Sequence, residues 1–375
     1  MLSSRTPSSI AAAVPSLALA AALTACTEPS RPTAASTPSV LASESSEPTT
    51  DPGLSVYGVG AVRRATPQSP CAEGAFRQFD FWVGDWVVSP TVPPPPPAPT
   101  PRTPSHIATA LDGCAILETW GGGGRSLNSY DPETGLWYQT WVPGPGRPFR
   151  MAGGLRPDGV MALEGTRHPY FAPTASWIDA YTWTPVDANH VVQAWTFDAL
   201  PSGFHLQGSL DYTRTATPLP MNPPSTARCQ AGGEAAETRL LDFTVGRWAV
   251  SASNGLPLGT TEIALDATLG GCLLEETFTT PKGYATIGWM YYDPVENAFY
   301  RSSVDSEGER VELRGPVTSS PISLEGAEPV PGAPGARVRL TWTAVSADEL
   351  RQTWEVATDA GASWRVAQTL VFTRR

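Results

Sequence analysis

The sequence of 375 residues predicts an all-β protein in which one domain occurs twice in tandem. The first observation is an ordered internal repeat. The second is a series of short β-rich runs separated by turn signals, without a long segment of helical periodicity. The third is the composition, because 39 Pro, 34 Gly and 13 Trp accompany only 16% charged residues. That mixture suits strands, turns and linkers better than helices.

The internal repeat pairs six short motifs of the first half with six of the second, in the same order and at offsets of 158 to 162 residues. The paired segments are 79–86 with 241–248, 113–120 with 271–278, 130–132 with 292–294, 182–184 with 341–343, 193–195 with 352–354, and 212–214 with 372–374. A repeat of this length is a domain rather than a solenoid unit. We therefore expect a first domain over 71–214, a proline-containing linker over 215–228 and a second domain over 229–375.

Alternating residues within each copy indicate about nine strands. In the run 137–142, Trp137, Gln139 and Trp141 share one face of a strand. Many meandering strands in a domain of this size imply a closed barrel or a sandwich. The run Pro93–Pro97 cannot donate ladder hydrogen bonds, so we expect it in a loop after the first strand.

The first residues predict export and lipidation. Residues 9–23 form an apolar stretch that is too short for a membrane-spanning helix. It ends in the segment 23–26 (LTAC), which resembles the bacterial lipobox. We therefore expect a lipoprotein signal peptide over 1–25 and acyl chains on Cys26, which would anchor the protein to a membrane. The alternative is an ordinary secretory signal that contains a cysteine.

The segment that follows predicts a tether. Residues 26–70 are rich in Ser, Thr, Pro and Ala and nearly lack aromatic residues, so they are expected to be disordered. The residue after the cysteine is Thr27. An Asp at this position would favour retention at the inner membrane. We therefore expect a lipid-anchored protein of the cell envelope, at the outer membrane in a Gram-negative cell.

The other four cysteines predict one disulfide in each copy. Cys71 and Cys114 are 43 residues apart, and so are Cys229 and Cys272. Equal spacing selects these two pairs among three possible pairings, and an oxidising compartment suits them. Metal binding is the rival interpretation, but no CxxC or Cys/His spacing supports it.

A Gly-x-Trp motif opens each copy, and an arginine stands near the end of each. This pattern resembles the lipocalin-like (calycin) barrels, in which an indole of the first strand packs under an arginine of the last. The resemblance implies two tandem antiparallel lipocalin-like β-barrels. It also implies that Trp86 with Arg214, and Trp248 with Arg374, close one end of each barrel.

The opening segment 79–86 (FDFWVGDW) resembles that of a family of uncharacterised bacterial proteins with an F-D-F-W-x-G-x-W motif. The resemblance extends through 113–120 and 126–141 and covers the first copy along its length. The second copy matches less well, with Thr244 and Ser303 where the first has tryptophans. The resemblance implies a lipocalin-like barrel and carries no activity, because the family's role is not established.

Polar residues among aromatic ones mark a candidate ligand site in the first barrel. A barrel of eight to ten strands is either filled or holds one small ligand. The residues on faces judged to point inward are Glu118, Asn128, Gln139, Trp141, Gln193 and Trp195. They predict an aromatic pocket with hydrogen-bonding groups for a small apolar or aromatic ligand. The alternative is that Glu118 and the glutamines bond backbone at a rim while the tryptophans fill the core.

Catalytic and cofactor signals are sparse. No Gly-x-Ser-x-Gly or His-Glu-x-x-His motif occurs, so we expect a protein that is not an enzyme. No metal site and no cofactor are expected. One alternative is haem bound through His205, because nitrobindin-like barrels ligate haem through a histidine. A surface or core histidine is the other interpretation.

Charge excludes one class of partner. The net charge is −11 and no Lys/Arg cluster occurs, which argues against binding to nucleic acid. The sequence therefore predicts a lipid-anchored envelope protein that binds a small ligand in its first barrel. The alternative is a structural or protein-interaction module whose barrels are filled.

Overall fold

The computed structural model describes residues 69–92, 99–144, 148–167, 176–200, 204–221, 234–327 and 335–375. The predicted signal peptide with Cys26, nearly all of the tether, the run Pro93–Pro97 and Cys229 lie outside the described residues. None of the described helices is long and apolar enough to cross a membrane.

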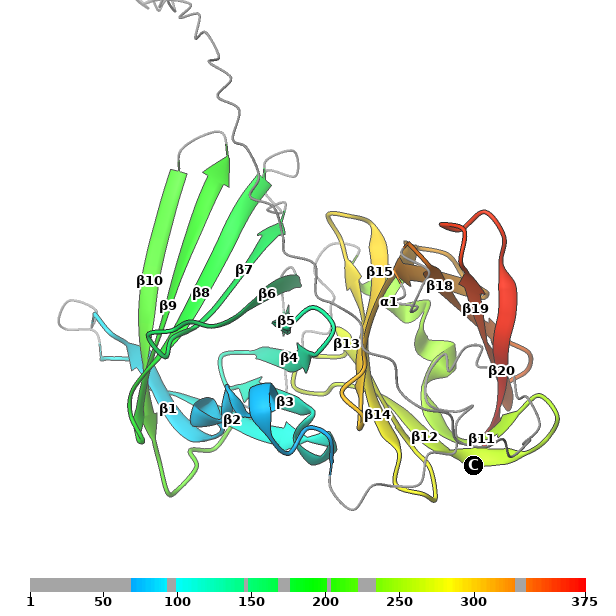
Figure 1. Ribbon diagram of the computed structural model, residues 1–375, viewed down its shortest axis with the longest axis horizontal. Helices are drawn as coiled ribbons and strands as arrows, with labels where there is room; N and C mark the ends of the chain where they lie inside the picture. The colour runs from blue at the N-terminus through cyan, green and yellow to red at the C-terminus, as the bar shows by residue number, and fades with distance from the viewer. Residues whose placement is uncertain are drawn as a thin grey trace, which may run out of the picture. The chain divides into compact units, whose positions relative to one another are not determined.

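The first copy folds into a closed antiparallel barrel in which each strand pairs with its neighbours in sequence and β1 pairs with β10 (Figure 1). Its strands are β1 Gly84–Pro90, β2 Thr103–Ala110, β3 Ala115–Trp120, β4 Gly124–Asp131, β5 Leu136–Pro143, β6 Phe149–Leu155, β7 Met161–Arg167, β8 Ser176–Asp187, β9 His190–Leu200 and β10 Phe204–Arg214. The last three are long and lie side by side in Figure 1.

The second copy repeats this topology and closes through β11 and β20. Its strands are β11 Gly246–Ala252, β12 Pro257–Leu265, β13 Leu273–Thr279, β14 Ala285–Asp293, β15 Ala298–Asp305, β16 Arg310–Pro316, β17 Ile322–Ala327, β18 Arg337–Ala344, β19 Glu349–Ala357 and β20 Arg365–Arg374. The predicted all-β architecture of two tandem barrels is confirmed. Each barrel has ten described strands, where alternation predicted about nine.

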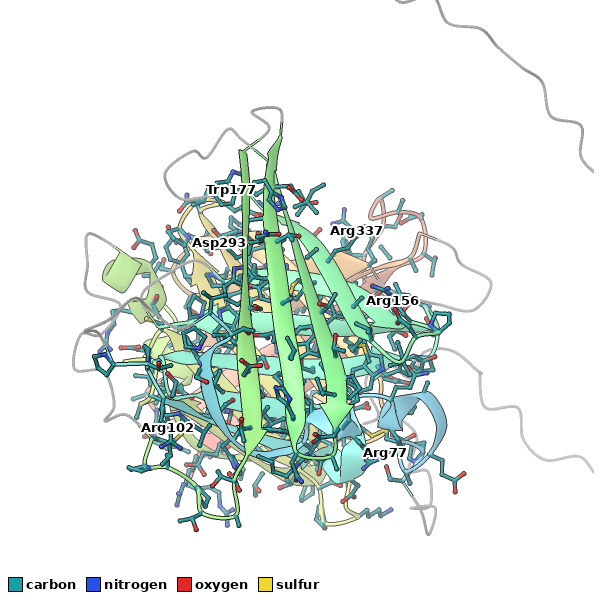
Figure 2. All side chains as sticks on the ribbon, turned by 90° about the vertical axis from the view of Figure 1, so that its left-hand side faces the viewer. Arg77, Arg102, Arg156, Trp177, Asp293 and Arg337 are labelled. Atoms are coloured by element: carbon teal, nitrogen blue, oxygen red, sulfur yellow. A yellow bond between two sulfur atoms is a disulfide. The ribbon has the colours of Figure 1, made fainter. Side chains whose placement is uncertain are left out.

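Short helices precede the first strand of each barrel, and a third 3-10 helix precedes β3. They are η1 Gly74–Arg77, η2 Asp80–Trp82 and η3 Leu111–Gly113 in the first copy, and α1 Glu234–Arg239 and η4 Asp242–Thr244 in the second. Phe79 and Trp82 stack with ring centroids 4.9 Å apart, and Phe79 meets Trp183 edge-on at 5.2 Å. The opening motif therefore fills one end of the first barrel. In Figure 2, Arg77 lies toward this end and Trp177 toward the opposite one.

Trp86 and Arg214 face each other across β1 and β10 at this filled end. The guanidinium carbon of Arg214 lies 4.2 Å from the centroid of the Trp86 ring. Its nitrogens donate to the carbonyls of Val83 at 2.7 Å and Phe81 at 3.2 Å. A Cβ at residue 84 would lie 2.0 Å from Arg214 Nη1, and φ there is +145°, so the motif requires Gly84 for both space and conformation.

The second barrel has the same arrangement at its first and last strands. Arg374 lies 4.2 Å from the Trp248 ring and donates to the carbonyls of Val245 at 3.4 Å and Ala347 at 2.9 Å. Trp248 donates to the Thr244 carbonyl at 2.9 Å. The two copies share the cation–π contact and the bond to Val83 or Val245, and Arg214 also bonds the Ala188 carbonyl as Arg374 bonds that of Ala347.

The Cys71–Cys114 disulfide is confirmed, with Cα atoms 4.9 Å apart. It joins the segment before η1 to the turn before β3. Cys272 is also disulfide-bonded. The Cys229–Cys272 pairing stays a prediction, because Cys229 lies outside the described residues.

The outer faces of β3–β5 and β13–β15 share a hydrophobic cluster that includes Leu127, Trp289 and Tyr300. Arg125 of β4 pairs with Asp266 and with Glu275, the latter at 3.0 Å. Every residue of β15 is buried, because one face lines the second barrel and the other packs in this cluster. Burial on both faces accounts for part of the low charged fraction of the sequence.

Candidate functional site

The first barrel contains a cavity of about 300 Å³. Its lining consists of Glu118, Trp120, Gln139, Trp141, Phe149, Tyr181, Gln193, Trp195, Phe197, Leu210 and Tyr212. Five of the six residues proposed from the sequence therefore lie around one space. The sixth, Asn128, is fully buried behind the lining and accepts a hydrogen bond from Gln139 Nε2 at 2.6 Å. The volume is at the lower end of the range for small-molecule sites, about 300–1,000 Å³.

Glu118 of β3 is the one carboxyl among the described lining residues, and it is 2% exposed. Ser105 of β2 donates to its Oε1 at 2.9 Å, and Ser126 of β4 donates to its Oε2 at 3.2 Å. Alternation along three neighbouring strands places these side chains on the inner face, where Glu118 stands opposite Ser126 in register. The carboxyl is therefore held in one orientation by groups that donate but carry no charge.

Burial raises the pKa of Glu118 from an ordinary value of 4.5 to about 7, because removal from water penalises the ionised form. Hydrogen bonds from Ser105, Ser126 and Tyr212 oppose the rise in pKa without cancelling it. Burial together with the charge of Glu118 also raises the pKa of Tyr212, so this phenol stays protonated. Near neutral pH the carboxyl can then hold or release a proton.

Asn128 and the two glutamines extend the polar end of the cavity. Asn128 donates to Ser126 Oγ and to the Ile116 carbonyl, both at 2.9 Å. Gln193 of β9 accepts from the Tyr212 hydroxyl at 3.4 Å. Glu118, Gln139 and Gln193 bond other side chains here, whereas the alternative expected them to bond backbone at a rim.

The walls of the cavity are aromatic and partly exposed, and they include Trp141, Trp195 and Phe197. Two glycines set the position of the indoles. A Cβ at Gly124 would lie 2.2 Å from the Trp141 ring, and one at Gly208 would lie 2.3 Å from the Trp195 ring. Each indole therefore lies flat against a neighbouring strand, which leaves the space above it open.

Several lining residues were not singled out from the sequence: Trp120, Phe149, Tyr181, Phe197, Leu210 and Tyr212. Some of them could have been found from the alternation of inner and outer faces along a strand. Phe197 follows Trp195 by two residues, and Tyr212 precedes Arg214 by two. Ser105 and Ser126 were also missed. Ser126 precedes Asn128 by two residues, whereas no local signal connects Ser105 with Glu118.

The structure places His205 on the surface of the first barrel, as the second of the two interpretations expected. Its side chain is about half exposed and pairs with Asp198, which stands opposite it on β9. Leu210 and Tyr212 point inward, so the odd spacing places His205 on the outer face of β10. Among the described residues, no group of three or more His, Cys, Asp or Glu could hold a metal ion.

No protein-family model and no curated protein matches the chain. A crystal structure of a protein of unknown function from the DUF3598 family of Nostoc punctiforme shares 11% identity, over 81% of this chain and 99% of that chain, with a TM-score of 0.21. Two mutants of the vaccine antigen transferrin-binding protein B from Haemophilus parasuis share 8% identity, over 78% of this chain and 75% of theirs, with TM-scores of 0.17 and 0.16. Similarities at these TM-scores carry no argument about function.

Proposed function

We propose that the protein binds a small apolar or aromatic ligand in its first barrel while lipid on Cys26 holds it at the outer membrane. The cavity lined by Trp141 and Trp195 carries the first part of this proposal. Apolar walls supply affinity, and a few fixed polar groups supply orientation, which is the usual composition of a ligand site. The lipobox-like segment 23–26 supports the second part.

The asymmetry between the copies supports a site in the first barrel. Trp354 corresponds to Trp195 but faces Gln368, whereas Trp195 faces Gly208. Trp354 is 3% exposed and donates to Gln352 at 2.9 Å. Without a glycine beneath it, this indole is directed into the second barrel and fills space that remains open in the first. A filled interaction module therefore fits the first barrel less well than a ligand site.

Filling the cavity tests the ligand site. Leu210→Trp replaces a lining side chain with a larger one, so the affinity for 3-propylindole should fall at least about tenfold. Leu136→Trp is the matched control, because Leu136 is 38% exposed on the same barrel. Calorimetric titration of the full chain, in identical detergent for both variants, measures the difference. Equal affinities of the two variants, or no binding by the unchanged chain, would contradict the site.

Replacement of Cys26 tests the anchor. Cys26→Ser should abolish incorporation of labelled palmitate and release the protein from the outer-membrane fraction, because stable anchoring depends on acyl chains. Fractionation with immunodetection measures both effects. Unchanged labelling in Cys26→Ser would show that the acylation site is elsewhere.

A further inference from the structure

The two barrels share a buried glutamate but differ in the side chain that faces it. Glu276 of β13 corresponds to Glu118, since each follows the cysteine of its copy by four residues. In the second barrel Arg301 takes the place of Gln139, and its Nη2 donates to Glu276 Oε2 at 2.8 Å. Both side chains are 5% exposed, so the second barrel contains an internal ion pair.

The surroundings of this ion pair are adapted to the guanidinium. Gly288 stands where the first barrel has Ser126, and a Cβ there would lie 2.7 Å from Arg301 Nη2. Ser303 replaces Trp141 and accepts a hydrogen bond from Arg301 Nη1. The guanidinium carbon also lies 5.9 Å from the centroid of the Trp354 ring. A carboxylate and an aromatic ring thus hold a cation that belongs to the chain.

The first barrel keeps the carboxyl and lacks the cation. None of the described residues that line its cavity is Lys, Arg or His. Gln139, in the place of the arginine, bonds Asn128 instead of Glu118. The rings of Trp141 and Tyr181 line the same space, and aromatic faces attract cations. This chemistry is complementary to an organic cation with an apolar body.

Building on the proposed ligand site, we propose that the cavity binds a small organic cation whose ammonium or guanidinium group pairs with Glu118, as Arg301 pairs with Glu276. The bound cation supplies the countercharge that the first barrel lacks. It offsets the cost of burial that raises the pKa of the carboxyl.

The groups that face Glu118 limit what else could titrate with the ligand. Tyr212 of β10 faces it directly, and Tyr181 and Asp179 lie along the inner face of β8. The described polar side chains near Glu118 on β2, β4, β5 and β9 are the hydroxyls of Ser105 and Ser126 and the amides of Gln139 and Gln193. Because Asp179 is a second buried carboxyl on the inner face, the comparison with Glu118→Gln is what assigns a change in cation affinity around neutral pH to Glu118.

Paired probes of one shape test the charge requirement. Calorimetry of the full chain at pH 8 should give at least about tenfold tighter binding of tryptamine than of its neutral isostere 3-propylindole. Glu118→Gln should remove this preference, while Glu164→Gln, on the outside of the same barrel, should keep it. If the unchanged chain binds both probes with equal affinity, the proposed preference for a cation is overturned and the proposed ligand site is not. Binding of neither probe would overturn both proposals.

A transplant and a pH profile provide independent readouts. S126G/Q139R copies the second barrel's internal cation into the first and should abolish the preference for tryptamine without lowering the melting temperature.

In the unchanged chain, tryptamine affinity should rise about tenfold per pH unit between about pH 5 and 7 and then level off, because only the ionised carboxylate pairs with it. Glu118→Gln should give a flat profile. A flat profile in the unchanged chain, or tryptamine binding undiminished in S126G/Q139R, would overturn the proposal.

Discussion

Trp86→Ala should lower the free energy of unfolding of the first barrel by about 3–5 kcal/mol, the usual cost of removing a buried indole. Trp86 is 1% exposed and donates from Nε1 to the Trp82 carbonyl at 2.8 Å. Its ring also carries the guanidinium of Arg214, whose hydrogen bonds fix η2 and the β8–β9 turn. The substitution leaves a cavity and removes the surface on which this arginine is stacked.

Urea unfolding followed by far-ultraviolet circular dichroism measures the loss without relying on tryptophan fluorescence. Trp248→Ala should cost a similar amount in the second barrel. The control is Trp364→Ala, because Trp364 also carries an arginine at 4.2 Å but is only partly buried, so its loss should stay under about 1 kcal/mol. A loss from Trp86→Ala no larger than that of the control would show that the pair does not hold the barrel closed.

Arg214→Lys separates charge from shape. Lysine keeps the positive charge but lacks the planar fork that bonds several carbonyls and stacks on the ring. We therefore expect a loss of about 1–2 kcal/mol, smaller than that of Trp86→Ala. Full retention of stability in Arg214→Lys would mean that charge alone accounts for the role of Arg214.

Features with a period of two residues could be predicted from the sequence. Alternation placed Gln139, Trp141, Gln193 and Trp195 on inner faces, because successive residues of a strand point to opposite sides. The same rule assigns His205 to the outer face once Tyr212 is known to point inward. His205 is the second residue of β10 and lies seven residues before Tyr212, an odd interval that puts the two side chains on opposite faces.

Features that depend on barrel curvature could not be predicted. Whether the interior is filled depends on which indoles lie flat, and this depends on contacts such as Gly208 beneath Trp195. The pairing of Gly208 with Trp195 follows from the register of β9 and β10, which alternation alone does not specify. The Ser105–Glu118 hydrogen bond also depends on register, because Ser105 of β2 stands diagonally opposite Glu118 of β3. The spacing of the cysteines was sufficient to predict the Cys71–Cys114 disulfide, because the same interval of 43 residues occurs in both copies.

Glu118→Gln should make the protein more stable than the unchanged chain at pH 8 by about 3 kcal/mol, and the two should differ little at pH 4.5. The pKa of Glu118 is about 7 in the folded protein against an ordinary value of 4.5, so the folded state binds more protons between these values. Its contribution to stability is therefore fully present below about pH 4.5 and is lost as the pH rises through about 7. Glutamine keeps the shape of the protonated acid and cannot ionise.

Urea unfolding of both proteins at several pH values measures this difference, and other carboxyls with a raised pKa, such as Asp305, cancel because both proteins contain them. Glu164→Gln provides the comparison for an exposed carboxyl of the same barrel. Parallel stability curves for Glu118→Gln and the unchanged chain would show that the carboxyl is not desolvated. If tryptamine at one saturating concentration stabilises the unchanged chain at pH 8 by more than it stabilises Glu118→Gln, the destabilising feature is the missing countercharge. The cost of burying Glu118 would then be what selects a cationic ligand.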